Sequence, residues 1–177
     1  YDAEAKVLRA MALFDLTRIY GKPYTVDQGS SLGVPIATFP LESTEKPSRS
    51  TVAQCYEAIE KDLTDAINSN ALPKTNEVGY VNLWAAKALQ VRVYMTKGEW
   101  SKALSVAEDI ISNSSYKLWE PSEYVAAWSK SDANHSKEIM FEISINNNTD
   151  WTDREGIAYL YAVSYTHLRA QRPRLIS

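Results

Sequence analysis

Residues 82–113 read NLWAAKALQVRVYMTKGEWSKALSVAEDIISN, and their pattern is that of two short helices joined by one tight turn. Asn82 is a typical helix N-cap, because its side-chain oxygen can accept a hydrogen bond from a free amide of the first turn. Gly98 separates the two halves, and glycine readily adopts the left-handed conformation that ends a helix. We therefore predict an antiparallel helical hairpin over residues 82–97 and 100–113.

The two predicted helices carry complementary side chains. The facing sets are Leu89, Val93 and Tyr94 on the first helix, and Ala103, Ala107 and Ile110 on the second. The two alanines are small enough to let the backbones approach closely. Trp84 and Trp100 also lie on the hairpin and are expected in its core. A glycine-centred turn between antiparallel helices resembles a tetratricopeptide (TPR) unit.

Another helix is predicted over residues 3–20, where apolar side chains lie on nearly every side. The stripe expected to face the core consists of Leu8, Met11, Ala12, Leu16, Ile19 and Tyr20, widened by Val7 and Phe14. A helix with so little polar surface is expected to be buried on most sides. Asp15 and Arg18 can form an ion pair on the remaining face, and Gly21 followed by Pro23 ends the helix.

The clearest helix signal follows Thr51. The tetrapeptide Thr51-Val-Ala-Gln54 has the spacing of a capping box, in which two side chains satisfy free backbone amides reciprocally. Apolar residues then recur at three- and four-residue intervals: Val52, Cys55, Tyr56, Ile59, Leu63, Ala66 and Ile67. Because Cys55 lies in this stripe, we interpret it as a small core residue and not as a nucleophile.

Two segments interrupt the helical pattern. Residues 21–48 contain four prolines and three glycines, which predicts a long irregular loop, either a surface connector or a functional or interface element. In residues 138–145, Ile139, Phe141, Ile143 and Ile145 alternate with polar or exposed positions, which is typical of a half-buried strand. The predicted fold class is mostly all-α, with TPR-like antiparallel helix pairs, one long Pro-rich loop and a short strand near residues 138–145.

Composition argues against several classes of function. The 177 residues carry 19 basic and 22 acidic side chains without a basic stripe, so nucleic acid is not an expected partner. One cysteine and two histidines in different elements cannot form a zinc site, and no nucleophile or phosphate-binding motif is present. We predict no enzymatic activity, no catalytic residue, no metal and no cofactor. A glycosidase carboxylate pair stays open as an alternative, because its two acids can come from any part of a chain.

Aromatic residues are the candidate ligand-binding groups, with five tryptophans and eleven tyrosines in the chain. A short helical turn is predicted from Pro121 to near Trp128. The candidates in loops or short turns are Trp119, Tyr124, Trp128 and Trp151, with Asn147 and Arg154 as polar partners. Aromatic planes can stack on the apolar face of a sugar while amide and guanidinium groups bind its hydroxyls. The alternative is that these rings anchor irregular loops to the core.

Several ordered stretches together resemble the SusD/RagB family. They are Glu4–Gly21 (EAKVLRAMALFDLTRIYG), then Gly33-Val-Pro35 followed by Arg49-Ser-Thr-Val52 and Tyr56–Leu63, then Ala85–Tyr94 with Gly98-Glu-Trp100, and finally Lys137–Ile143. The first stretch is similar to a strongly marked helix of the family, and the last is similar to the strand that follows its helical hairpin. The resemblance covers about residues 2–162.

The resemblance implies a surface lipoprotein of Bacteroidota-type bacteria. Such proteins lie over a SusC-like TonB-dependent transporter in the outer membrane and deliver glycans, or sometimes peptides, to it. A lipid anchor, outside the sequence given, would be the sole attachment to the membrane. The alternative is a cytosolic TPR-type adaptor that binds protein tails. That alternative predicts more helix pairs at a period of about 34 residues, and the Pro-rich loop disfavours it.

Residues 1–162 are expected to form a partial SusD-like domain that contains the TPR-like pairs. Residues 163–177 do not fit the preceding pattern, because VSYTHLRA at 163–170 resembles a translated sequencing-library adapter. We therefore expect a non-native tail there. The larger C-terminal part of family members is missing from residues 1–162, so these residues are expected to expose apolar helix faces.

Overall fold

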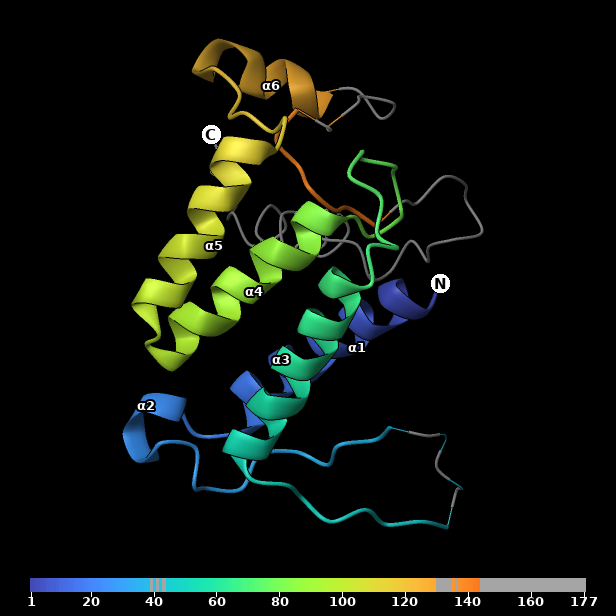
Figure 1. The fold of residues 1–177 in the computed structure, drawn as a ribbon, viewed down its shortest axis with the longest axis vertical. Coiled ribbons are helices and arrows are strands. Elements are labelled where there is room, and N and C mark those ends of the chain that lie inside the picture. The colour runs from blue at the N-terminus through green and yellow to red at the C-terminus, as the bar shows by residue number, and fades with distance from the viewer. Residues whose placement is uncertain (39, 41, 43, 130–134, 136, 144–177) are drawn as a thin grey trace, which may run out of the picture. The chain divides into compact units, whose positions relative to one another are not determined.

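The computed structural model describes residues 1–38, 40, 42, 44–129, 135 and 137–143. Over these residues the helices are α1 (Asp2–Tyr20), α2 (Tyr24–Asp27), α3 (Val52–Asn68), α4 (Leu83–Lys97), α5 (Trp100–Asn113) and α6 (Pro121–Ser129). Figure 1 shows α1 beside α3, and α4 and α5 as an antiparallel pair. The all-α class predicted from the sequence is confirmed, with helix bounds close to those expected.

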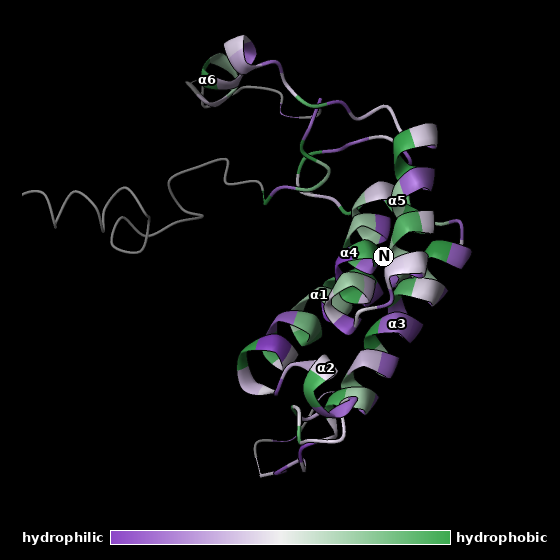
Figure 2. Ribbon diagram, turned by 90° about the vertical axis from the view of Figure 1, so that its left-hand side faces the viewer, coloured by the Kyte–Doolittle hydropathy of each residue, from purple (hydrophilic) through white to green (hydrophobic). Residues whose placement is uncertain are grey.

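Helix α3 supplies the largest part of the core. The predicted capping box is present: the Thr51 hydroxyl accepts from the Gln54 amide at 3.2 Å, and the Gln54 side chain accepts from the Thr51 amide at 2.9 Å. Its buried apolar residues are Val52, Cys55, Tyr56, Ile59, Leu63 and Ala66, whereas Ile67 is partly buried. Figure 2 shows hydrophobic and hydrophilic residues alternating along this helix. Each large apolar side chain buried in this way stabilises the fold by about 1.5–3 kcal/mol relative to exposure.

Helix α1 buries a different face from the one predicted. Its buried residues are Ala3, Val7, Ala10, Leu13, Phe14 and Thr17. Of the predicted stripe, Leu8, Leu16, Ile19 and Tyr20 are exposed. The prediction was right for Val7 and Phe14 and partly right for Met11, but wrong for these four residues. An apolar residue occurs on every side of this helix, so periodicity alone cannot select the face. The contact with α3 selects it, and Arg9 donates two hydrogen bonds across that contact to the buried Asp62 carboxylate, at 2.6 and 2.7 Å.

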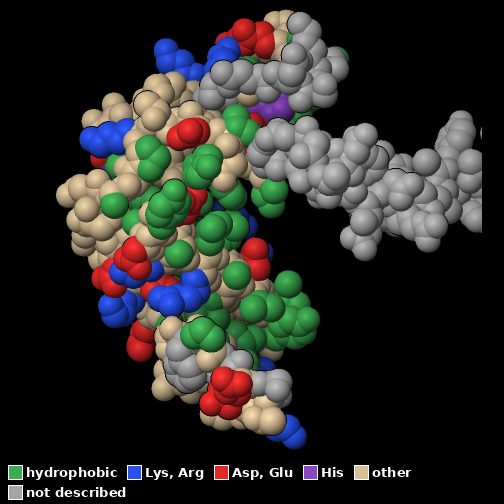
Figure 3. Space-filling view, turned by 90° about the vertical axis from the view of Figure 1, so that its right-hand side faces the viewer, with side chains coloured by type: hydrophobic (Ala, Val, Ile, Leu, Met, Phe, Trp, Pro, Cys, Tyr) green, Lys and Arg blue, Asp and Glu red, His purple; other side chains and the backbone are tan. Residues whose placement is uncertain are grey.

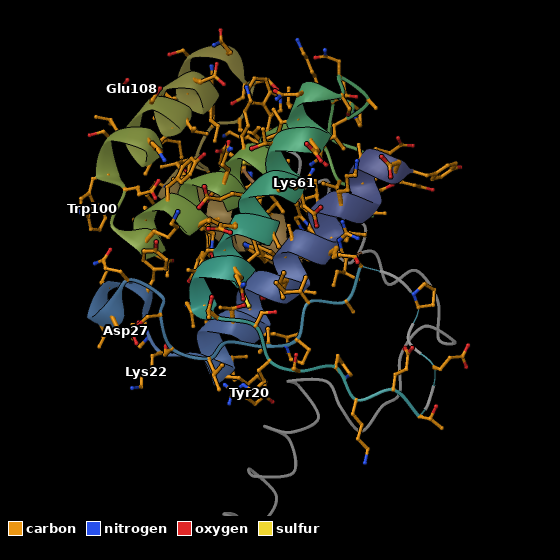
Figure 4. All side chains as sticks on the ribbon, turned by 60° about the horizontal axis from the view of Figure 1, so that its bottom comes forward. Tyr20, Lys22, Asp27, Lys61, Trp100 and Glu108 are labelled. Atoms are coloured by element: carbon orange, nitrogen blue, oxygen red, sulfur yellow. The ribbon has the colours of Figure 1, made fainter. Side chains whose placement is uncertain are left out.

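The α4–α5 hairpin agrees with the predicted pattern in most of its details. The Asn82 side chain accepts from the Ala85 amide at 2.9 Å, and Gly98 has a φ of 80°. The facing residues are buried or half-buried. Trp84 is buried as predicted, with 5% of its surface exposed. The prediction for Trp100 was wrong, because this residue begins α5 on its outer side and is 65% exposed, as Figure 4 shows.

The Pro-rich loop is irregular apart from the single helical turn of α2. Residues 32–33, near the middle of the loop, form a short antiparallel contact with residues 50–51, just after it, in which the Gly33 amide donates to the Ser50 carbonyl at 2.7 Å. Arg49 donates to the carbonyls of Gly33, Leu32 and Tyr20, so one guanidinium holds both the loop and the end of α1. A Cβ at Gly33 would lie 2.9 Å from the Cys55 sulfur, which explains why a glycine occupies this position.

The predicted strand is not present over residues 138–143. A strand requires a partner for its backbone groups, and here side chains take that role. The Asn76 amide group donates to the Ile139 carbonyl at 2.8 Å, and the Asn82 amide group donates to the Met140 carbonyl at 2.7 Å. The remaining predicted strand positions, 144 and 145, lie outside the described residues.

Chain contacts divide the protein into two units, Tyr1–Glu142 and Ile143–Ser177. All of the helices named above belong to the first unit. Among the described residues, no helix has the length and apolar character needed to cross a bilayer. The predicted boundary between 1–162 and 163–177 falls outside the described residues and stays a prediction.

Gly98→Ala is predicted to destabilise the protein by about 1–2 kcal/mol, the cost of placing a Cβ in the left-handed conformation. Steric contact contributes little, because the nearest atom to such a Cβ, on Thr25, is 3.7 Å away. Chemical denaturation would measure the change in the free energy of unfolding. Gly98→Asn is the matched control and should cost less, since asparagine tolerates this conformation. An alanine variant as stable as the wild type would contradict the assigned turn.

Residues 1–162 prepared alone are predicted to self-associate, because α1 and α5 expose apolar side chains such as Ile19, Leu104 and Ile111. Figure 3 shows hydrophobic side chains gathered on an exposed face of the chain. Sedimentation velocity at increasing concentration would measure the association. Ile19→Lys should reduce it without lowering the melting temperature, whereas Ile59→Lys should unfold the core. A monomer at high concentration would contradict the prediction.

Candidate functional site

Three predicted ligand-binding residues form one aromatic cluster. The ring centroid of Trp119 lies 6.0 Å from that of Tyr124 and 5.9 Å from that of Trp128, both in edge-to-face geometry. The Tyr124 and Trp128 centroids are 6.4 Å apart and their planes are tilted by 57°. These separations are within the range of favourable aromatic contacts. The structure therefore brings together Trp119, Tyr124 and Trp128, as a single group at α6.

Local sequence explains how the cluster forms. Tyr124 and Trp128 are four residues apart on α6, so they share one side of the helix. The Glu123 side chain accepts from the Glu120 amide at 3.1 Å and satisfies a free group at the start of α6. Trp119 precedes this turn, and its amide donates to the Glu138 carboxylate at 2.7 Å.

His135 completes the cluster and was not predicted from the sequence. Its ring lies 4.6 Å from the Trp128 ring, with an angle of 27° between the two planes, which is a stacked contact. Its Nδ1 is 2.7 Å from a Glu142 carboxylate oxygen, and its Nε2 is 3.0 Å from the Ala127 carbonyl oxygen. The hydrogen bond to Glu142 raises the pKa of His135 above its ordinary value of 6.5. Partial desolvation opposes that rise, and the Ala127 carbonyl adds to it.

Asn82 connects this region to the helical hairpin. This residue is fully buried, and its side-chain nitrogen donates to the Tyr116 hydroxyl at 3.0 Å and to the Met140 carbonyl at 2.7 Å. Burial raises the pKa of Tyr116, and its bond to Asn82 opposes the rise. One asparagine thus caps α4 and holds both chain segments that lead to the cluster, the one before Trp119 and the one after His135.

The cluster leaves two rings accessible to a ligand. Tyr124 is 53% exposed and Trp128 is 51% exposed, while Trp119 is partly buried between them and His135. The three other predicted site residues are Trp151, Asn147 and Arg154, and all of them lie outside the described residues. Among the described residues, no group of three or more His, Cys, Asp or Glu side chains is arranged to hold a metal ion.

A separate groove of about 300 Å³ lies between α1, α4 and residues 138–141. Its lining is mainly apolar, with Leu8, Met11 and Phe141 among the side chains. Arg92 and Glu138 are the charged residues of this lining. Leu8 and Met11 belong to the α1 stripe that the sequence predicted to be buried, so part of that stripe faces this groove.

Asn82→Ser is predicted to destabilise the protein by about 1–3 kcal/mol, because serine retains a capping oxygen but removes the donor to Tyr116 and Met140. Thermal and chemical unfolding would measure the loss. Asn76→Ser is the matched control, because it removes one bond, to the Ile139 carbonyl, from a residue that is less buried. If the Asn82 variant is as stable as the wild type, the bonds from Asn82 to Tyr116 and Met140 do not hold these segments to the hairpin.

Comparison with known proteins places the chain in a family. The family of SusD-like proteins described as "Starch-binding associating with outer membrane" matches residues 1–95. A SusD superfamily protein from Bacteroides thetaiotaomicron is 46% identical and has a TM-score of 0.73, over 81% of this chain and 30% of its own. A putative sugar-binding protein from Bacteroides vulgatus is 45% identical and has a TM-score of 0.75, over 84% of this chain and 33% of its own.

A more distant match is a laminarin-binding SusD-like protein, 26% identical with a TM-score of 0.58, over 74% of this chain and 28% of its own. The comparison with curated proteins finds no match. The chain spans about a third of the length of the solved structures it matches. The family match to residues 1–95 and the two structures above 40% identity agree with the helical arrangement described above, and the chain therefore belongs to the SusD/RagB family.

Proposed function

We propose that this chain is part of a cell-surface protein that binds oligosaccharides and passes them to a TonB-dependent transporter of the outer membrane. The observation that carries the proposal is the cluster of Trp119, Tyr124 and Trp128 at α6, in which two rings are half exposed. Family membership and the sugar-binding or laminarin-binding description of two matched structures support the same ligand class.

The geometry of the cluster suits a flat, partly apolar ligand. The Tyr124 and Trp128 planes are inclined to each other by 57°, so together they offer two adjoining surfaces. The C–H face of a pyranose ring can stack on an aromatic plane. The Tyr124 hydroxyl can donate to or accept from a sugar hydroxyl. Trp151, Asn147 and Arg154 stay proposed ligand-binding residues on the strength of the sequence.

The proposed setting is the bacterial outer membrane, with a lipid anchor and a SusC-like transporter as the protein partner. The helical pairs would form the rigid support, and the segments beyond α5 would bind the ligand. The cytosolic adaptor alternative requires further helix pairs at a regular period. In this chain the described segments after α5 contain one short helix, α6, and no second helix that would pair with it. Absence of catalysis is part of the proposal, supported by the starch-binding description of the family and the sugar-binding description of a matched structure.

Trp128→Ala in the intact protein is predicted to weaken oligosaccharide binding at least about tenfold, as expected when a central aromatic contact is lost. Isothermal titration calorimetry with glucose oligomers from starch and from laminarin would measure the affinity. Trp100→Ala is the matched control, because Trp100 is a similarly exposed tryptophan on α5, outside the cluster. Its removal should leave affinity unchanged.

Trp151→Ala is predicted to weaken the same binding, because Trp151 is proposed as a ligand-binding ring, and unchanged affinity would return it to a structural role. If the wild type binds clearly and the Trp128 variant binds with the same affinity, the cluster does not bind the sugar and its role is structural. A wild-type protein that binds no oligosaccharide in a broad panel would contradict the proposed ligand class.

A further inference from the structure

The contacts of His135 favour the doubly protonated form of its ring. A backbone carbonyl oxygen and a carboxylate oxygen are both acceptors. The Nε2–Ala127 contact at 3.0 Å therefore requires a proton on Nε2, and the Nδ1–Glu142 contact at 2.7 Å requires a proton on Nδ1 unless the carboxyl group carries it. Below the raised pKa of His135 the ring carries both protons and is an imidazolium, the form in which it donates to both acceptors.

The imidazolium is placed where its charge is stabilised. Ala127 lies in the last turn of α6, where carbonyl groups are unpaired and the helix dipole favours a cation. The stacked Trp128 ring adds a cation–π contact at 4.6 Å, and Trp119 contacts the histidine edge-on at 6.1 Å. The His135 side chain is only 15% exposed, so little water competes for these contacts.

Among the described residues, three other charged side chains near this cluster have partners of their own. Lys137 pairs with Glu123, and Glu138 accepts from the Trp119 amide. Glu142, on the segment after His135, is the one charged side chain bonded to the ring among the described residues. With Glu142 ionised, a neutral His135 would hold one proton for two acceptors. One acceptor would then face a nitrogen lone pair, and the ring would have to turn away from it.

We propose that His135, as an imidazolium, is a positioning residue that holds the Trp128 ring in the orientation required for sugar binding. This inference rests on the proposed function for its effect on affinity, although the effect on Trp128 is independent of any ligand. Its consequence is a binding site that weakens as the pH rises. The contribution of His135 is complete below about pH 6.5 and is lost as the pH rises through the higher pKa of the folded state.

The test follows Trp128 directly, in the intact protein labelled with 5-fluorotryptophan. Fluorine NMR would record the Trp128 resonance, assigned with Trp128→Phe, as a function of pH. We expect a single titration with a midpoint above 6.5 that disappears in His135→Gln. Glu142→Gln removes the carboxylate but retains its shape, so the midpoint should move down. A Trp128 resonance that does not titrate, or that titrates unchanged in His135→Gln, would overturn the proposal.

The second part of the test measures oligosaccharide affinity across the same pH range. We expect the wild-type affinity to fall about three- to tenfold through the Trp128 midpoint, the range for loss of a contact that orients a ring. His135→Gln should show the weaker affinity at every pH. Wild-type affinity that is independent of pH would overturn the positioning role. Titration of Trp128 without any sugar binding would instead contradict the proposed function and retain the effect of His135 on Trp128.

Discussion

The buried amide of Asn82 is the contact on which the arrangement beyond the hairpin depends. A fully buried amide must satisfy its donors and acceptor within the protein, because an unpaired polar group in the interior costs free energy. Asn82 does so by accepting from Ala85 and donating to Tyr116 and Met140. The start of α4, the segment after α5 and the segment before Ile143 therefore meet at one side chain, although they are distant in sequence.

The sequence was most informative where amphipathic character was strong. Helix α3 has one apolar face and a capping box, and its start and its buried apolar residues were predicted correctly, except that Ile67 is only partly buried. Helix α1 was predicted as a helix, but its buried face was predicted only in part, because its apolar residues surround the helix. There the packing against α3 and the Arg9–Asp62 bond choose the face. The expected strand failed for another reason: alternation does not provide a partner, and Asn76 and Asn82 bind its carbonyls instead.

The candidate site was predicted in part. Tyr124 and Trp128 share a side of α6 because they are four residues apart, and that spacing is visible in the sequence. Trp119 joins them because its backbone amide donates to the Glu138 carboxylate. No local sequence pattern reveals this contact. His135 was missed because its role depends on Glu142 and on a carbonyl of α6. The sequence signal for this role is a histidine and a glutamate seven residues apart, His135 and Glu142. They follow a short helix that carries Tyr124 and Trp128.

The site and the scaffold are stabilised by different forces. The helices α1, α3 and α4 bury apolar side chains, a contribution that is largely independent of pH. The aromatic cluster is held by a few polar bonds: Asn82 to Met140, Trp119 to Glu138, and His135 to Glu142 and Ala127. Segments held by few contacts open at lower free energy than the core. A change in the charge of His135 can therefore alter the cluster while the helical scaffold stays folded, which is the property that a ligand site responsive to pH requires.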